Sequence, residues 1–275
     1  LSIKPDFADA HFNLGITYQK LKQLDKALAS FERAIALNTN IDFAIGILLN
    51  TKMHLCLWDD LEKRLNELTK KINNDEKVII PFSFLALIDD PEVQRKNTEI
   101  YANEKYPQSD VLSKIGRYPK HKKIRIGYFS TDFRDHPVAY LTAELYEMHD
   151  RNQFEIYAFS FGPDTDDEIH LRIKAEVDHF HDVDTMSHKD VAMLARSLEI
   201  DIAVDLGGYT LGCRTEIFAM SAAPIQISYI GYLGTMGANY YDYLVADQTI
   251  IPEKNQKYYS EKIAYLPNYQ VNDSK

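Results

Sequence analysis

A histidine and an aspartate stand four residues apart in a loop suited to moving a proton. The segment Thr131–Pro137 follows an apolar run and contains Asp132 and His136. Imidazole binds and releases protons near neutral pH, and a neighbouring carboxylate can orient it or accept a proton through water. Pro137 stiffens the loop. We therefore expect His136 and Asp132 to be catalytic; the alternative is an ordinary loop histidine with Asp132 as a helix cap.

Two further loops are rich in glycine. Residues 207–214 read GGYTLGCR and residues 231–237 read GYLGTMG. Six of the 11 glycines lie between residues 207 and 237, which lets backbone approach a ligand closely and leaves amides free to donate. Arg214 is expected to contact a phosphate or the backbone of an acceptor, unless it makes only a surface salt bridge.

Two acidic triplets and a histidine pair have the spacing of metal sites. Residues 164–166 (DTD) and 182–184 (DVD) match the DxD of metal-dependent glycosyltransferases, and His179 and His181 alternate as on one strand face. Such triplets arise by chance in a chain with 41 acidic residues, and both lie outside the glycine-rich loops. The histidines have no obvious third ligand. We therefore expect no metal site.

Alternating strands and helices must position these loops. From residue 122 onward, short apolar runs alternate with helical patterns, which predicts a parallel, doubly wound sheet. The expected strands are residues 123–130, 154–161, 179–183, 200–206, 225–230, 243–247 and 263–266, and the expected helices are 138–150, 168–177, 189–198 and 216–220. Ligands of such sheets bind beyond the carboxyl ends of the strands. We expect the three loops to meet there in one crevice.

The chain begins with a helical repeat. Residues 8–41 have the spacing of a tetratricopeptide unit, with the small residues Gly15 and Ala27 where two helices touch and Phe31 in their shared seam. Leucines continue the seam through residues 42–72, which predicts a degenerate last helical pair; an unrelated amphipathic pair is the alternative. Because a repeat needs neighbours to bury its apolar face, we expect the chain to derive from a longer array.

The patterns divide the chain into three parts. Residues 1–75 are expected to form tetratricopeptide-type repeats, residues 76–121 a helical linker, and residues 122–275 the α/β lobe. The linker is expected to be broken at its prolines and to pack on the sheet, because its stretch Ile79–Ile88 is strongly apolar.

The three loops, in this order behind a tetratricopeptide repeat, resemble the O-linked N-acetylglucosamine transferases of glycosyltransferase family 41, which include the plant SPINDLY-type enzymes. Each motif alone is weak, but the ordered set is specific and covers nearly the whole chain. The matching segments are residues 126–133 with 136–137, 208–210 with 214, 223–226, 231–232 with 234–235, 242–243 with 247, and 259–262 with 266–267.

The resemblance implies two facing Rossmann-like lobes of the GT-B type, with residues 122–275 as the N-terminal lobe and the second lobe missing. It implies transfer of N-acetylglucosamine from UDP-N-acetylglucosamine to Ser or Thr of proteins, with inversion and without a metal. The residues implied to bind substrate are Tyr209, Thr210, Arg214, Gly231 and Leu233, the last in place of a frequent proline. Because the second lobe would hold the diphosphate, the 275-residue chain alone is expected to be inactive.

Composition argues against several other classes. No GxGxxG follows the first strand and no GxxxxGK[ST] occurs, so dinucleotide and P-loop sites lack their mechanism. A formal net charge of −10 does not suit a general nucleic-acid binder. No apolar run is long enough to span a membrane. The two cysteines have no metal-type spacing and fit a reducing cytoplasm.

The expected partners are acceptor proteins, held by the tetratricopeptide superhelix, and a nucleotide sugar, with no nucleic acid, membrane or cofactor. Two alternatives remain open at this stage. One is a sister transferase that moves fucose or glucose, and the other is a non-catalytic adaptor that uses the repeat to bind peptides.

Overall fold

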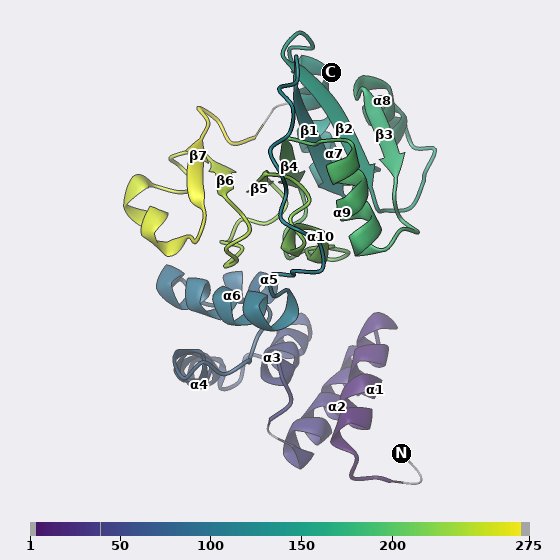
Figure 1. The fold of residues 1–275 in the computed structure, drawn as a ribbon. Coiled ribbons are helices and arrows are strands. Elements are labelled where there is room, and N and C mark those ends of the chain that lie inside the picture. The colour runs from purple at the N-terminus through teal and green to yellow at the C-terminus, as the bar shows by residue number, and fades with distance from the viewer. Residues whose placement is uncertain (1–3, 39, 271–275) are drawn as a thin grey trace. The chain divides into compact units, whose positions relative to one another are not determined.

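A computed structural model of the protein describes residues 4–38 and 40–270. The chain forms two compact units, Leu1–Tyr101 and Ala102–Lys275 (Figure 1). The first unit is helical, and the second contains a sheet flanked by helices. Among the described residues, no helix is both long and apolar enough to cross a membrane.

The helical unit starts with the expected hairpin. Phe31 is fully buried, and a Cβ atom on Gly15 would lie 2.5 Å from its ring, so glycine is needed for this ring to sit against the first helix. Leu48 shares a buried cluster with Ala27 and Phe31 and so joins the third helix to the hairpin. The helices are α1 Ala8–Lys20, α2 Leu24–Leu37, α3 Ala44–His54, α4 Leu61–Asn73, α5 Pro81–Leu85 and α6 Pro91–Lys105.

The apolar stretch Ile79–Ile88, which was the reason to expect the linker on the sheet, is buried against the second helical pair. Ile79 and Phe84 are buried in one cluster with Leu68 of α4. A Cβ atom on Gly46 of α3 would lie 2.5 Å from the Cβ of Ile79. The glycine therefore opens the space on α3 that the stretch occupies.

Two prolines of the expected linker begin helices. Pro81 is the first residue of α5 and Pro91 the first of α6. Proline suits this position because the first N–H of a helix has no partner within the helix. The segment 107–121 that follows α6 has no helix or strand.

The second unit contains a seven-stranded sheet in the order β3-β2-β1-β4-β5-β6-β7. Every neighbouring pair is parallel. The predicted fold class, helical hairpins followed by a Rossmann-like parallel sheet, is confirmed. The strands are β1 Ile124–Ser130, β2 Phe154–Ser160, β3 His179–Asp182, β4 Ile202–Asp205, β5 Ile225–Ser228, β6 Tyr243–Ala246 and β7 Lys262–Tyr265.

Helices cover both faces of this sheet. Ile126 and Tyr128 of β1 lie in a buried cluster with residues of α7 and α8. Phe129 points to the other face, where its ring packs edge-on against Phe218 of α10, and α10 contacts α9. These helices are α7 Pro137–Met148, α8 Glu168–Glu176, α9 His188–Ser197 and α10 Glu216–Ala219, and the short 3-10 helix η1 Glu253–Tyr258 precedes β7.

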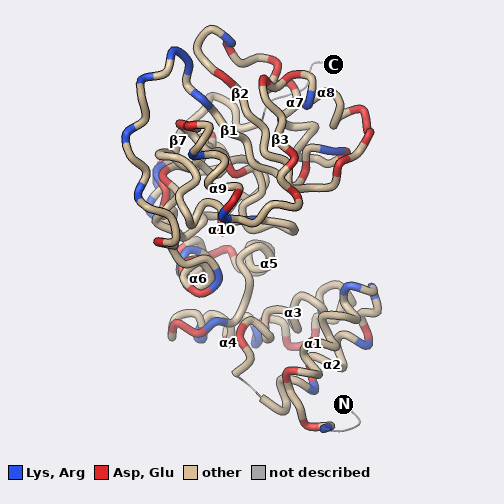
Figure 2. Tube along the Cα trace, turned by 45° about the vertical axis from the view of Figure 1, so that its right-hand side comes forward, with Lys and Arg blue, Asp and Glu red and all other residues tan. Residues whose placement is uncertain are grey.

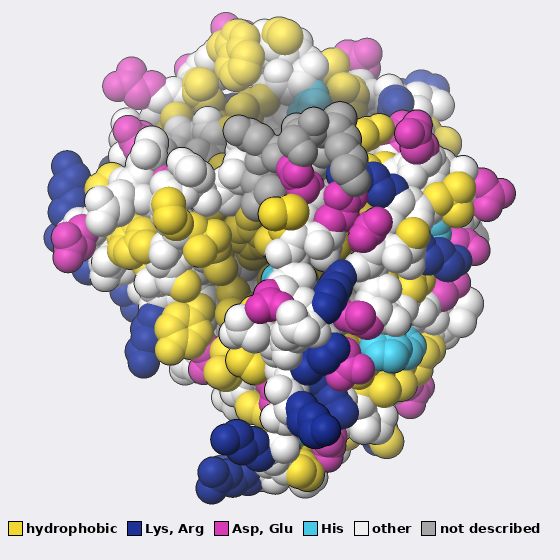
Figure 3. Space-filling view, turned by 90° about the horizontal axis from the view of Figure 1, so that it is seen from above, with side chains coloured by type: hydrophobic (Ala, Val, Ile, Leu, Met, Phe, Trp, Pro, Cys, Tyr) yellow, Lys and Arg dark blue, Asp and Glu magenta, His cyan; other side chains and the backbone are white. Residues whose placement is uncertain are grey.

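Charge is mixed over the surface. Residues 114–125 carry basic residues with no acidic one among them, and along most of the remaining trace both signs are interspersed (Figure 2). On the face shown in Figure 3, hydrophobic side chains gather on one side and charges of both signs on the other.

Candidate functional site

The central strands end level with one another at the carboxyl edge of the sheet. Ser130 of β1 pairs with Ser160 of β2, and Asp205 of β4 pairs with Ser228 of β5. The loops that follow these strands therefore start at the same edge, which is where ligands bind in open parallel sheets.

Two glycines let the three predicted loops touch. A Cβ atom on Gly212 would lie 3.1 Å from Oγ1 of Thr131, so the first and second loops meet there. A Cβ atom on Gly208 would lie 2.5 Å from the Cβ of Tyr232, so the second and third loops meet as well. Both glycines also have positive φ, +81° for Gly212 and +55° for Gly208, which other residues adopt with strain.

His136 and Asp132 lie together in the first loop, as expected. Nδ1 of His136 is 3.6 Å from Oδ2 of Asp132. The same Nδ1 accepts a hydrogen bond from the backbone N–H of Val138 at 3.3 Å, so the cap of α7 is His136 itself and not Asp132. The His136 side chain is 35% exposed and that of Asp132 only 7% exposed.

Nδ1 of His136 has two partners that exclude each other. A neutral ring protonated on Nε2 accepts from Val138 through Nδ1, whereas a ring protonated on Nδ1 donates from Nδ1 to Asp132. Nε2 of His136 has no hydrogen-bond partner in residues 4–38 and 40–270. Burial raises the pKa of Asp132, while His136 and Arg134 oppose that rise, Arg134 donating to Oδ1 at 3.3 Å. Only a ring that carries its proton on Nδ1, facing Asp132, can take up a second proton at Nε2, and Asp132 can then stabilise the resulting charge.

Sequence reasoning missed Asp205, a buried carboxylate that organises the second loop. Its Oδ1 accepts from the amides of Gly207 at 2.9 Å and Gly208 at 3.0 Å, and the hydroxyl of Tyr241 donates to Oδ2 at 2.5 Å. Burial raises the pKa of Asp205, and these three hydrogen bonds oppose the rise. The two glycine amides already have a partner, so the expectation that they are free to bind a ligand is wrong.

Tyr209 and Thr210 form hydrogen bonds within the protein. The buried Tyr209 donates its hydroxyl to the carbonyl of Met236 at 2.6 Å. Thr210 donates its hydroxyl to the carbonyl of Gly207 at 2.9 Å. Both bonds stabilise the loops, and a direct contact of either residue with substrate stays a prediction.

Arg214 anchors the segment that follows β3. Its guanidinium donates to the carbonyls of Val183 at 3.0 Å and Met186 at 2.5 Å and lies 5.5 Å from the centre of the Phe161 ring. Burial lowers the pKa of Arg214. Two of its donors are thus used inside the protein, and the expected contact with a phosphate or acceptor stays a prediction.

The third loop starts with a strained residue, and the next position is a glycine that has no room for a side chain. Ile230 has φ of 65°, a conformation that β-branched residues rarely adopt and that often marks functional sites. A Cβ atom on Gly231 would lie 2.0 Å from the carbonyl oxygen of Leu206. Leu233, further along, is 52% exposed and is free to contact a ligand.

Sequence reasoning also did not single out Glu261. Its carboxylate stabilises the third loop through hydrogen bonds. Glu261, just before β7, is buried and accepts hydrogen bonds from the hydroxyl of Thr235 at 2.7 Å and the amide of Met236. Burial raises the pKa of Glu261, and these bonds oppose the rise.

Comparisons with known proteins identify this arrangement. The model of the family described as Glycosyl transferase family 41 matches residues 98–275. The chain belongs to glycosyl transferase family 41. The model of the Tetratricopeptide repeat matches residues 8–40, so the repeat found in the sequence is confirmed as well.

Relatives of this family 41 chain are named peptide N-acetylglucosaminyltransferases. The probable UDP-N-acetylglucosamine–peptide N-acetylglucosaminyltransferase SEC of Arabidopsis thaliana is 36% identical over 247 residues, which are 83% of this chain and 25% of that protein. The UDP-N-acetylglucosamine–peptide N-acetylglucosaminyltransferase of Caenorhabditis elegans is 27% identical over 238 residues, 78% of this chain and 20% of that protein.

A solved structure is similar along almost the whole chain. A mutant O-GlcNAc transferase of Thermobaculum terrenum has 27% sequence identity and a TM-score of 0.69, covering 98% of this chain and 53% of that one. The chain therefore spans about half the length of this solved relative and about a quarter of the Arabidopsis relative.

The metal-like motifs of this family 41 member have other partners. Asp164 lies 3.2 Å from Nε2 of His170, and His179 lies 3.0 Å from Glu155. The ring of His181 stacks on a neighbouring phenylalanine. Within the part of the chain that the structure describes, no three His, Cys, Asp or Glu side chains are grouped so that they could hold a metal ion.

Proposed function

We propose that the protein transfers N-acetylglucosamine from UDP-N-acetylglucosamine to Ser or Thr side chains of other proteins. The observation that carries the proposal is the family 41 match over residues 98–275, the region that contains the His136–Asp132 pair at the carboxyl edge of the sheet. The names of the relatives support the sugar and the peptide acceptor.

The geometry supports a role of His136 in moving the acceptor proton. A Ser or Thr hydroxyl must lose its proton as it attacks the sugar. The His136 ring is one third exposed, and in the tautomer protonated on Nδ1 its Nε2 can accept this proton. Asp132 can then stabilise the resulting imidazolium through Nδ1 at 3.6 Å. The departing diphosphate needs donors other than the amides of Gly207 and Gly208, because Asp205 already accepts from both.

The complete protein that carries these residues allows a direct test of His136. We expect N-acetylhexosamine to appear on an acceptor protein by mass spectrometry, and His136→Ala to lower kcat about a hundredfold or more, the usual scale of acid–base catalysis. The matched control is His179→Ala, which should leave turnover unchanged. His179 is another histidine beside a carboxylate, but it lies at the start of β3 and so at the amino edge of the sheet.

The separate kinetic constants distinguish the roles of His136. A fall in kcat with an unchanged KM for the acceptor supports proton transfer, whereas a rise in KM alone would make His136 a positioning residue. Full activity of His136→Ala would remove the residue from the mechanism.

We also propose that the transfer inverts the anomeric carbon and needs no metal, as the family resemblance implies. NMR of the glycosylated product gives the anomer, and activity in excess EDTA tests the metal. A retained anomer or loss of activity in EDTA that added metal restores would contradict these two points.

We propose, finally, that the helical unit binds the acceptor proteins. The tetratricopeptide match at residues 8–40 supports this, because such repeats present extended surfaces to peptide segments. Loss of acceptor binding on disruption of the α1–α2 hairpin, with donor binding retained, is the expected result. Unchanged acceptor binding would contradict this role.

A further inference from the structure

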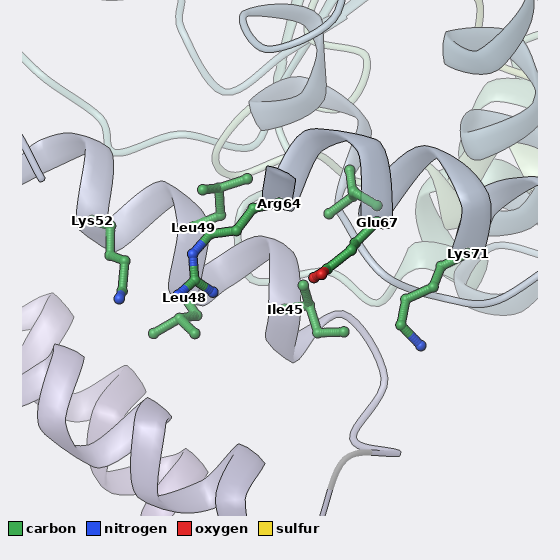
Figure 4. Close-up of a pocket in the computed structure, with 8 residues that line it drawn as sticks. Ile45, Leu48, Leu49, Lys52, Arg64, Glu67 and Lys71 are labelled. Carbon is green, nitrogen blue, oxygen red and sulfur yellow. The ribbon is translucent and has the colours of Figure 1, made fainter. Parts of the chain in front are cut away.

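A hollow between α3 and α4 of the helical unit is lined by aliphatic and charged side chains (Figure 4). Two of its cations, Lys52 and Lys71, form ion pairs with glutamates outside the hollow, and the third, Arg64, shares the rim with Glu67. These charges balance, so the hollow selects neither an anionic nor a cationic ligand. The side chains around the first loop of the α/β unit have contacts of a more specific kind.

The segment that follows β2, residues 161–167, lies against the loop that carries the proposed catalytic pair. The amide of Phe161 donates to the carbonyl of Ser130 at 3.0 Å. A Cβ atom on Gly162 would lie 1.9 Å from the carbonyl oxygen of Thr131, so the two backbones touch where no side chain fits. The segment after β2 is therefore placed to fix the first loop.

Asp167, the last residue of this segment, has two oxygens with separate tasks. Its Oδ1 accepts from the amide of His170 at 2.8 Å and so caps α8. Its Oδ2 accepts from the amide of Asp135 at 3.1 Å, and Asp135 directly precedes His136. One carboxylate thus joins the start of α8 to the backbone of the first loop, through hydrogen bonds that its charge strengthens.

His170 of α8 makes a second contact with the first loop. Its ring is buried, and its Nδ1 lies 2.6 Å from the carbonyl oxygen of Phe133. A carbonyl oxygen can only accept, so Nδ1 of His170 is protonated and donates this hydrogen bond. Phe133 directly follows Asp132, the carboxylate of the proposed catalytic pair.

The two fixed backbone groups thus lie between the members of that pair, one next to Asp132 and one next to His136. Nδ1 of His136 is 3.6 Å from Oδ2 of Asp132, which is longer than the roughly 3 Å of an N–H···O hydrogen bond. A small displacement of residues 133–135 therefore decides whether the ring can donate to the carboxylate.

We propose that Asp167 and His170 are positioning residues, which fix the backbone of residues 133–135 so that His136 stays beside Asp132. Neither of the two positioning residues needs to touch the reacting atoms. The effect on turnover rests on the proposed function, in which His136 moves the acceptor proton. The acidic segment that starts with the metal-like triplet 164–166 would thus serve the site through its last carboxylate, Asp167.

Substitutions can separate the contact with the first loop from the stability of α8. Asp167→Ser keeps the helix cap, because serine caps about as well as aspartate, but its single oxygen cannot also accept from Asp135. Asp167→Ala loses both bonds. His170→Leu removes the donor to Phe133 at similar size, whereas His170→Asn keeps an N–H group near the place of Nδ1.

The matched control is Asp178→Ser. Asp178 also accepts from a backbone amide, that of Ile156 at 2.7 Å, but it directly precedes β3 and so lies at the amino edge of the sheet. This variant loses a similar hydrogen bond without touching the first loop, and it should leave kcat unchanged.

Kinetics of the complete protein give the first measurement. Asp167→Ser, Asp167→Ala and His170→Leu should each lower kcat about tenfold or more with an unchanged KM for the acceptor, because misplacing a reacting group by about 1 Å costs up to a hundredfold. His170→Asn should restore most of the turnover. Of the two Asp167 variants, only Asp167→Ala should also lower the urea midpoint of unfolding.

The double variant with His136→Ala tests whether Asp167 acts through His136. In the His136→Ala protein, Asp167→Ser should lower kcat no further, because the group that it positions is gone. NMR of the histidine rings gives a readout without any sugar donor. The His136 signal, assigned by its loss in His136→Ala, should move in Asp167→Ser and His170→Leu and stay in place in Asp178→Ser.

Because the NMR measurement involves no transfer, absence of transferase activity would refute the proposed function while a moved His136 signal would still support the positioning role. The positioning role is overturned if Asp167→Ser leaves the His136 signal and kcat unchanged, if it lowers kcat equally in the His136→Ala protein, or if His170→Asn behaves like His170→Leu. Asp167 is half-buried, so Asp167→Ser tests the role even if His170→Leu disturbs folding.

Discussion

Acid is expected to weaken the α/β unit through His149. This residue follows the last turn of α7, whose first turn is capped by His136. Nε2 of His149 lies 2.8 Å from the Tyr128 hydroxyl, which can donate to the neutral ring protonated on Nδ1. Burial and, to a smaller extent, Arg151 lower the pKa of His149 from 6.5 to about 4, against a weak opposing effect of Asp178.

The sign and size of the effect follow from this pKa. The unfolded chain binds a proton at His149 near pH 6.5, whereas the folded protein does so only near pH 4. The stabilisation is therefore present above pH 6.5 and is lost as the pH falls toward 4. At pH 4 the loss amounts to about 3 kcal/mol, since each unit of pKa difference is worth about 1.4 kcal/mol and the folded ring is then half protonated.

Urea unfolding at pH 7 and pH 4 measures this loss, with His149→Gln as the comparison. The glutamine oxygen can accept from Tyr128 and does not titrate, so the wild type should lose about 3 kcal/mol more than the variant over this range. Near-ultraviolet circular dichroism of tyrosines follows the α/β unit, and fluorescence of Trp58, the single tryptophan, follows the helical unit as an internal control. Equal losses in both proteins would refute the reasoning.

Two further predictions concern the loops of the site. Gly231→Ala should lower the free energy of unfolding by about 3 kcal/mol or more, because its Cβ would meet the rigid carbonyl of Leu206. Gly116→Ala, with no atom within 4 Å of the added Cβ, should change this free energy little. Similar losses for the two variants in urea unfolding would contradict the steric argument. Asp205→Ala should lower the free energy of unfolding by about 2–4 kcal/mol, because it leaves buried loop amides unpaired. Asp205→Asn keeps an accepting oxygen and should lower it less. Equal losses for the two variants in urea unfolding would contradict this prediction.

The elements after residue 122 could be predicted because each has a local signal. The first strand, expected at residues 123–130, spans Ile124–Ser130, and the last, expected at residues 263–266, spans Lys262–Tyr265. Each is a short apolar run beside a segment of helical period, and that pattern alone favours a parallel sheet. The pairing of His136 with Asp132 could be predicted for the same reason, since four residues of one loop separate them.

Contacts between distant segments had no such signal. Arg214 follows a glycine-rich strand end, but nothing local shows that the segment after β3 offers it the carbonyls of Val183 and Met186. The role of Asp205 had a weak signal, because a charged residue ends an apolar strand directly before two glycines. Its acceptance of a hydrogen bond from Tyr241, far along the chain, had none.

The glycines of the site serve close packing more than ligand binding, and this changes what the lobe can contribute to catalysis. Two glycine amides donate to Asp205, and the amide of Gly231 donates to the carbonyl of Tyr229 at 2.9 Å. These hydrogen bonds fix the second and third loops, and the second loop meets the first at Thr131, five residues before His136. Stabilisation of the departing diphosphate then depends on donors other than these amides. In the proposed reaction the lobe thus supplies the acceptor side of the chemistry, and the charge of the leaving group is met by other groups.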